Sequence, residues 1–171
     1  MRRYGLLLAS AMLAALSGCD GNGDGERLAP PAFDLTGYWV TTAMDCDVFS
    51  NDIPESELAR LEAEFEDDVS QDPGTRVVQT GNDLVITDVD SGLQINGTIL
   101  GDQVRYVYSE QRSVDGADVS IHVESEGTAL DADTIAGTQE LDWTITIQGE
   151  ETITGGALCT GSTTRVSSPE S

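Results

Sequence analysis

Few residues of this chain could carry out chemistry. His122 is the one histidine, and no Gly-x-Ser-x-Gly motif marks a nucleophilic serine. His122 stands between Ile121 and Val123, and this alternation predicts a side chain on the outer face of a strand. The histidine and the cysteines lack the spacing of a zinc site. The sequence therefore predicts no catalytic centre, metal site or cofactor, and we expect the protein not to be an enzyme.

The three cysteines are the other reactive side chains, and the first of them follows an export-like segment. Two arginines near the start precede an apolar run over residues 6–16, and two small residues then lead to Cys19. The run is too short to span a bilayer, which takes about 20 apolar residues. These features predict that residues 1–18 are a signal peptide, cleaved between Gly18 and Cys19.

The end of that segment, Leu16-Ser17-Gly18-Cys19, resembles the lipobox of bacterial lipoproteins. The resemblance implies that the Cys19 thiol is acylated and becomes the new N-terminus. Two or more acyl chains hold a protein stably on a membrane. The resemblance therefore implies that this protein is bound to a membrane through its N-terminal lipid. It further implies a location in the bacterial cell envelope, facing the periplasm or the exterior, with the choice of membrane left open. An ordinary signal peptide with an incidental cysteine is the alternative.

If Cys19 carries lipid, Cys46 and Cys159 are the two remaining cysteines. An exported domain lies in an oxidising compartment, where cysteines form disulfides. We expect these two residues to form a disulfide. Two free, buried thiols are the alternative interpretation.

The charge balance excludes one class of partner. The chain has 31 acidic residues against 8 basic ones, all of them arginine, and a formal net charge of −23. Nucleic-acid binding needs clustered positive charge, so we expect no nucleic-acid partner. Anionic headgroups would repel such a domain, which leaves the lipid as its contact with the bilayer.

The 171 residues are enough for one domain and a tether. Residues 19–32 are rich in Asp, Gly and Pro, which predicts a flexible acidic tether after the lipidated cysteine. Residues 33–166 carry the periodic patterns of a folded domain. Residues 167–171 are expected to be a disordered tail.

Residues 37–42 are aromatic and β-branched, which predicts a first strand. Within residues 51–69 four apolar side chains recur at spacings of 3, 4 and 4, as on one face of a helix. Asp52 with Glu55 predicts a capping box at the start of that helix.

The rest of the domain is predicted to be strands joined by turns that contain Gly, Asn and Asp. Seven strands are expected: 75–80, 84–89, 93–100, 104–110, 119–130, 134–148 and 152–166. Several alternate with one apolar face, which is typical of antiparallel sheets. Gly97, Gly137 and Gly155 fall on the inward face, where glycine marks a bend. The sequence therefore predicts a mainly β fold, an up-and-down meander closing into a barrel of about eight strands, with one short helix after the first strand.

A second resemblance concerns the start of the domain, where Gly37-Tyr38-Trp39 is similar to the Gly-x-Trp of lipocalins. It implies an apolar pocket, with Trp39 packed at the base of the barrel. Trp39, Tyr106, Tyr108 and Trp143 would line this pocket or simply fill the core. We thus expect a non-catalytic domain that binds a small apolar ligand or lipid. The alternative is an envelope protein with a filled barrel whose acidic face meets a basic protein partner.

Overall fold

The computed structural model describes residues 29–71, 74–114, 117–147 and 152–167, without the side chains of residues 64–71 and 114. The expected signal peptide, Cys19, most of the tether and residues 168–171 lie outside this part of the chain. The eight strands are β1 (Gly37–Ser50), β2 (Thr75–Thr80), β3 (Asp83–Asp88), β4 (Gln94–Leu100), β5 (Gln103–Val114), β6 (Ala117–Ala129), β7 (Thr134–Ile147) and β8 (Thr152–Val166).

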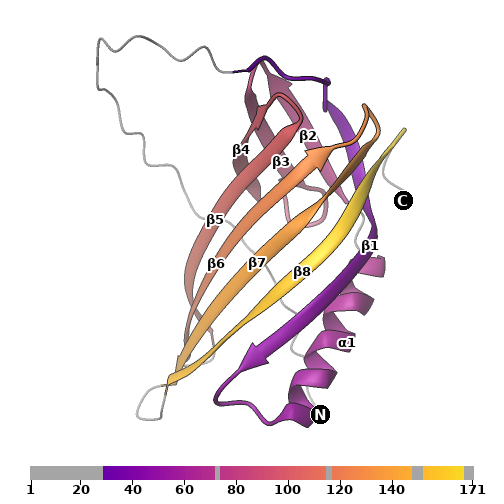
Figure 1. Ribbon diagram of the computed structural model, residues 1–171. Coiled ribbons are helices and arrows are strands. Elements are labelled where there is room, and N and C mark those ends of the chain that lie inside the picture. Colours follow the sequence, from indigo (N-terminus) through magenta and orange to yellow (C-terminus); the bar gives the residue numbers. More distant parts are fainter. Residues whose placement is uncertain (1–28, 72–73, 115–116, 148–151, 168–171) are drawn as a thin grey trace.

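All neighbouring strands are antiparallel, and they close in sequence order into one barrel in which β1 also pairs with β8 (Figure 1). The helix α1 (Glu55–Gln71) follows β1. The predicted mainly β fold, an eight-stranded up-and-down barrel with a short helix after the first strand, is confirmed. Among the described residues, no helix has the length and apolar character needed to cross a membrane.

The first strand is longer than the sequence predicted. A register shift between Thr41 and Ala43 marks a β-bulge, after which the buried positions move from odd to even numbers, as at Cys46 and Val48. Because the buried positions change parity at the bulge, the sequence shows no continuous alternation along β1. The strand nevertheless continues to Ser50. Cys46 therefore lies within β1 and not, as expected, in the chain just after it.

Cys46 and Cys159 are direct partners in the β1–β8 register, and their sulfur atoms lie at disulfide distance, as predicted. Both side chains are buried. They form a small core cluster on which Leu58 and Leu61 of α1 pack. This cluster joins the helix to the barrel.

The predicted capping box is wrong. The helix begins at Glu55, and the carbonyl of Pro54 accepts hydrogen bonds from the backbone N–H groups of Glu57 and Leu58. The carboxylate of Asp52 instead accepts a 3.0 Å hydrogen bond from the backbone N–H of Thr154 on β8. The Asp52 side chain therefore bonds to a neighbouring strand, although the local sequence predicted that it caps the helix.

The barrel wall is uneven in height. Strands β2, β3 and β4 have six or seven residues, whereas β5 to β8 and β1 have 12 to 15. The long strands extend past the short ones at one end of the barrel, where α1 lies beside β1 (Figure 1). The molecule therefore has a closed eight-stranded half and an open half built from five strands and a helix.

Candidate functional site

The described part of the barrel contains a cavity of about 370 Å³ between two buried clusters of side chains. One cluster, at the closed half, includes Leu35, Trp39 and Ile99. The other surrounds the two cysteines. Residues from β1, β2, β3, β5, β6, β7 and β8 line the space between them, including Thr41, Thr75, Val77, Leu84, Ile86, Val104, Tyr106, Ser125, Ile135, Gln139, Leu141, Ala157, Cys159 and Thr163. This is the principal candidate for a binding site.

The closed end of the cavity is formed by the chain that enters β1. Leu35 is almost fully buried, and its backbone N–H donates a 2.8 Å hydrogen bond to the Gln79 side chain. The indole N–H of Trp39 donates to the carbonyl of Leu35 at 2.8 Å, so no polar atom of the ring is left unpaired. On its other side, the guanidinium of Arg165 lies 5.2 Å from the centre of the Trp39 ring. Trp39 is thus held at the base of the barrel.

The cavity exists in part because one stretch of wall carries no side chains. Gly127, Gly137 and Gly161 are successive partners across β6, β7 and β8, and we call them the glycine row. All three line the cavity. A Cβ on Gly137 would lie 2.3 Å from the carbonyl oxygen of Glu126, so the strands approach more closely here than any other residue allows.

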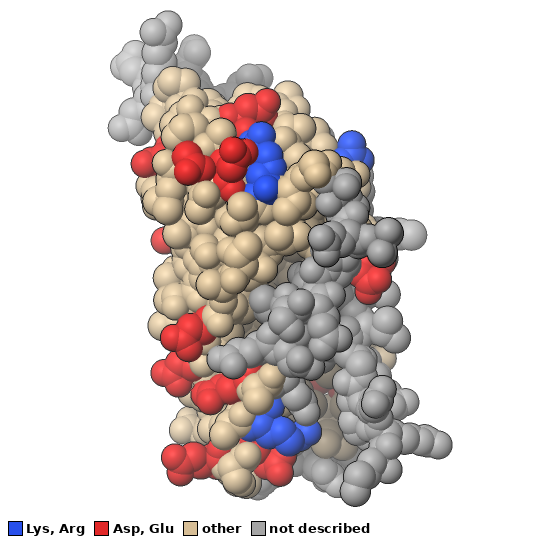
Figure 2. All heavy atoms as spheres, turned by 90° about the vertical axis from the view of Figure 1, so that its right-hand side faces the viewer, with Lys and Arg blue, Asp and Glu red and all other residues tan. Residues whose placement is uncertain are grey.

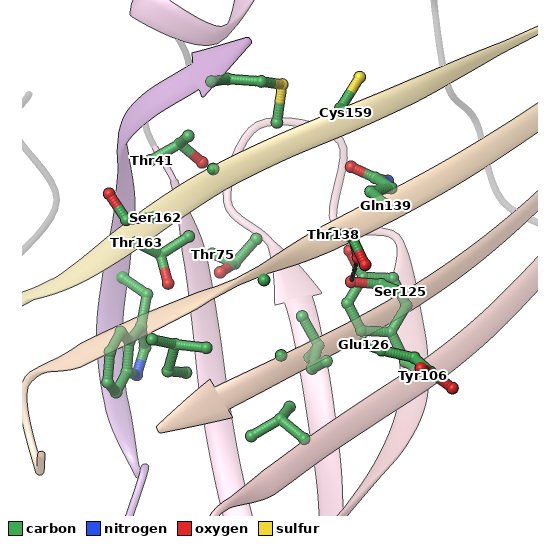
Figure 3. Close-up of a pocket in the computed structure, with 18 of the residues that line it drawn as sticks. Thr41, Thr75, Tyr106, Ser125, Glu126, Thr138, Gln139, Cys159, Ser162 and Thr163 are labelled. Carbon is green, nitrogen blue, oxygen red and sulfur yellow. Dashed lines mark hydrogen bonds between the residues drawn. The ribbon is translucent and has the colours of Figure 1, made fainter. Parts of the chain in front are cut away.

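The polar groups of the cavity are few and almost all uncharged. Figure 3 shows hydroxyl and amide side chains placed around it, including those of Thr41, Thr75, Ser125 and Gln139. The carboxylate of Glu126 is the charged group among the lining residues that the structure describes, and its side chain is 67% exposed. Apolar walls with a few hydrogen-bonding groups are typical of small-molecule sites.

Tyr106 contributes the phenol of the cavity. Burial raises the pKa of Tyr106, and a hydrogen bond with Ser125 partly offsets this rise. The phenol is therefore neutral at ordinary pH, and together with Ser125 it can donate or accept a hydrogen bond from a bound molecule.

The structure separates the four aromatic residues that the sequence singled out. Trp39 and Tyr106 line the cavity. Trp143 packs on the cluster of the two cysteines, and Tyr108 points to a neighbour on its own strand. Neither belongs to the lining of the cavity.

Tyr108, which is partly buried, pairs with the buried Glu110 on the inner face of β5. The phenol donates a 2.7 Å hydrogen bond to the Glu110 carboxylate, which is 8% exposed. Desolvation, followed by the hydrogen bond and the negative charge of Glu110, raises the pKa of Tyr108 to about 12. Alternation places Glu110 inside the barrel, but the sequence pattern did not identify this buried acid.

We expect alkaline pH to destabilise the fold through Tyr108. Below pH 10 the phenol is neutral in both states, so its contribution to stability is complete. Between about pH 10 and about pH 12 the unfolded chain loses the proton first, and the free energy of unfolding falls. In urea unfolding across this pH range, the free energy of unfolding should fall less steeply with pH for Tyr108→Phe than for the wild type. An equal fall in both proteins would contradict the role given to Tyr108.

His122 lies on the outer face, as its alternation predicted, and it has two partners there. Its Nδ1 atom lies 2.7 Å from the Ser109 hydroxyl, and its Nε2 atom lies 3.3 Å from a carboxylate oxygen of Glu124. The serine is its cross-strand partner on β5, a proximity that the sequence alone did not reveal. All three side chains are partly exposed and do not line the cavity.

The charged side chains on the face shown in Figure 2 are mostly acidic. Figure 2 shows many carboxylates and few arginines on one side of the molecule. Arg105 pairs with Glu124 at 3.5 Å and with Glu126 at 3.4 Å, and these side chains are 45–67% exposed. Exposed ion pairs of this kind contribute about 0–1 kcal/mol each. Within the described residues, no three His, Cys, Asp or Glu side chains are grouped as a metal site.

Comparison of the chain with protein-family models, with curated proteins and with solved structures finds no match.

Proposed function

We propose that the protein is a lipid-anchored lipoprotein of the bacterial cell envelope whose barrel binds a small, apolar and uncharged ligand. The observation that carries the proposal is the cavity of about 370 Å³ with mostly apolar walls. Known ligand pockets span about 300–1,000 Å³, so this cavity suits a compact molecule or a short chain. Its near lack of charge favours a neutral ligand, because an ionised group would lose its hydration without a partner.

Binding can be tested with a neutral, apolar dye that fluoresces in apolar surroundings, N-phenyl-1-naphthylamine. In a Trp143→Phe variant, Trp39 is the one remaining tryptophan and lies in the cavity wall. We expect energy transfer from Trp39 to bound dye. The exported chain should also carry a discrete added mass in native mass spectrometry if its own ligand is retained.

A matched pair of variants separates the cavity from the surface. Thr41 lines the cavity, whereas its neighbour Thr42 lies on the outer face at the bulge. Thr41→Phe fills the space and should weaken dye binding at least tenfold, and Thr42→Phe should leave it nearly unchanged. Dye binding that survives Thr41→Phe would place the ligand elsewhere.

The anchor rests on the sequence, where Leu16-Ser17-Gly18-Cys19 resembles a lipobox. We expect the protein to partition with membranes and to incorporate labelled palmitate when it is expressed in a Gram-negative host. Cys19→Ser should abolish the label and release the domain into the soluble fraction, because one substitution removes all acyl chains. Retention on membranes by Cys19→Ser would contradict lipidation.

The second candidate function is an envelope interaction protein with a basic protein partner. The formal net charge of −23 and the acidic outer face favour it. Crosslinking in whole cells, with mass spectrometry of the products, would identify such a partner.

A further inference from the structure

The inner wall of the barrel carries a row of polar side chains beside the glycine row. Tyr106 on β5, Ser125 on β6 and Gln139 on β7 are successive partners in the strand register, and we call them the polar row. All three line the cavity, and Figure 3 shows them in this order on neighbouring strands. Cys159, the next partner on β8, is held in the disulfide. Three hydrogen-bonding side chains are therefore gathered at one level of the cavity.

The members of the polar row differ in what they leave for a bound molecule. Tyr106 and Ser125 share a hydrogen bond, and the Ser125 hydroxyl also lies 3.4 Å from the carbonyl oxygen of Thr138. Gln139 is partly buried, and no residue in the described part of the chain forms a hydrogen bond with its side-chain amide. An amide has two N–H donors and one carbonyl acceptor. The Gln139 amide is therefore the main polar group that a ligand can use.

The wall on either side of Gln139 is apolar or bare. Two residues along β7 in one direction stands Leu141, whose partner on β8 is Ala157, and both line the cavity. Two residues in the other direction lies Gly137 of the glycine row, and beyond it Ile135, which packs against the cluster at the base. A ligand that reaches Gln139 therefore places one polar group there and apolar surface beside it.

The glycine row gives the apolar part of the ligand its direction. It lies between the polar row and the buried cluster that contains Trp39, and it leaves bare backbone on that stretch of wall. From Gln139 to Ile135 the strand rises about 13 Å, at about 3.3 Å per residue. An extended hydrocarbon chain that starts at Gln139 would therefore lie over the glycine row and point to Trp39.

The chemistry of Gln139 selects the polar group of the ligand. The lining residues that the structure describes include no lysine, arginine or histidine, so a bound carboxylate would lose its hydration without a cationic partner. An ester can accept a hydrogen bond from Nε2 of Gln139 but cannot donate one to Oε1. A carboxamide does both, because it has a carbonyl oxygen and an N–H group.

We propose that the ligand of the barrel is an apolar chain with a neutral carboxamide at one end, and that Gln139 recognises this group through two reciprocal hydrogen bonds. The Ser125 hydroxyl, on the neighbouring strand, can bond to the second lone pair of the ligand carbonyl. This inference rests on the proposed function, because it specifies the molecule that the same cavity binds.

The test uses the exported full chain in mild detergent, with the Trp143→Phe substitution as the parent protein. Three ligands with the same acyl chain compete with N-phenyl-1-naphthylamine: decanamide, methyl decanoate and decanoate. Energy transfer from Trp39 reports the dye that is bound close to it, and the affinity for the dye is measured first for each protein. We expect decanamide to bind at least tenfold more tightly than the other two, because each of them leaves a polar atom of Gln139 unpaired.

Two matched variants show whether Gln139 is responsible. Gln139→Leu removes the amide with little change in volume and should weaken decanamide binding about tenfold, with a smaller loss for methyl decanoate. Gln94 is exposed on β4, a strand that contributes no residue to the described lining. Gln94→Leu should therefore leave all three affinities unchanged. Thermal unfolding shows whether both variants are folded, and the ranking of the three ligands by the parent protein decides if Gln139→Leu is not.

Two results would overturn this inference alone. Equal affinities of the parent protein for decanamide and methyl decanoate would mean that the polar row does not recognise an amide, although the cavity still binds apolar molecules. A preference for decanamide that persists in folded Gln139→Leu would place the amide elsewhere in the barrel. Absence of dye binding is a different result, since it would overturn the proposed function and this inference with it.

Discussion

Gly137→Ala should reduce the free energy of unfolding by about 3 kcal/mol. The added Cβ would lie 2.3 Å from the carbonyl oxygen of Glu126 and 2.7 Å from the Cα of Gly127. Both are backbone atoms of the paired strand β6, so no side-chain rotation can relieve the contact. The two strands would have to separate two positions from the Ala129–Ile135 end of their pairing, next to the turn that joins β6 to β7. Chemical denaturation of the wild type and the variant measures the difference.

Gly81→Ala is the matched control for this prediction. Gly81 has a positive φ of 62°, and a Cβ there would meet nothing within 4 Å. Its substitution should cost only the backbone penalty, about 1 kcal/mol. If Gly137→Ala were no more destabilising than Gly81→Ala, the close approach of the strands at the glycine row would be wrong. Loss of all folded protein in Gly137→Ala would agree with the prediction.

The glycine row also connects the fold to the proposed function. Strands that carry a normal inward side chain at each of these positions would fill the centre of a small barrel. Gly127, Gly137 and Gly161 leave bare backbone there instead. The same three residues that let the wall bend also leave space for a ligand. A substitution in the row is therefore expected to affect stability and binding together.

Much of the fold follows from local patterns in the sequence. Alternation on β4 to β7 predicted the meander, because one face of each strand is buried and the period is two. The inward glycines Gly97 and Gly137 predicted bends, and the positions of Cys46 and Cys159 predicted that the first and last strands are neighbours. These features need no knowledge of distant contacts.

The unpredicted features depend on register, which the sequence did not specify locally. Because β1 continues past the bulge at Thr42, Cys46 lies within this strand. The Asp52 carboxylate accepts a hydrogen bond from Thr154 on β8 and does not cap the helix. The glycine row needs three strands in register before it becomes visible. The proximity of Ser109 and His122 likewise depends on the pairing of β5 with β6. A pattern within one strand cannot reveal any of them.

Reduction of the Cys46–Cys159 bond should lower the free energy of unfolding by about 4–5 kcal/mol, the other large effect expected for this barrel. The bond closes a separation of 113 residues, so it removes much of the freedom of the unfolded chain. The folded barrel should survive reduction, because β1 and β8 remain paired along most of their length. We therefore expect a lower denaturant midpoint with an unchanged circular dichroism spectrum.

The double variant Cys46→Ala with Cys159→Ala makes this prediction specific. It should have a lower midpoint than the oxidised wild type, and reductant should not change it further. Its midpoint should also fall slightly below that of the reduced wild type, because two buried sulfur atoms that pack on Leu58 and Leu61 are lost. A wild-type midpoint that does not respond to reductant, in protein that mass spectrometry shows to be reduced, would contradict the argument. The stability of the barrel would then come from strand pairing and core packing, and closure by the disulfide would contribute little.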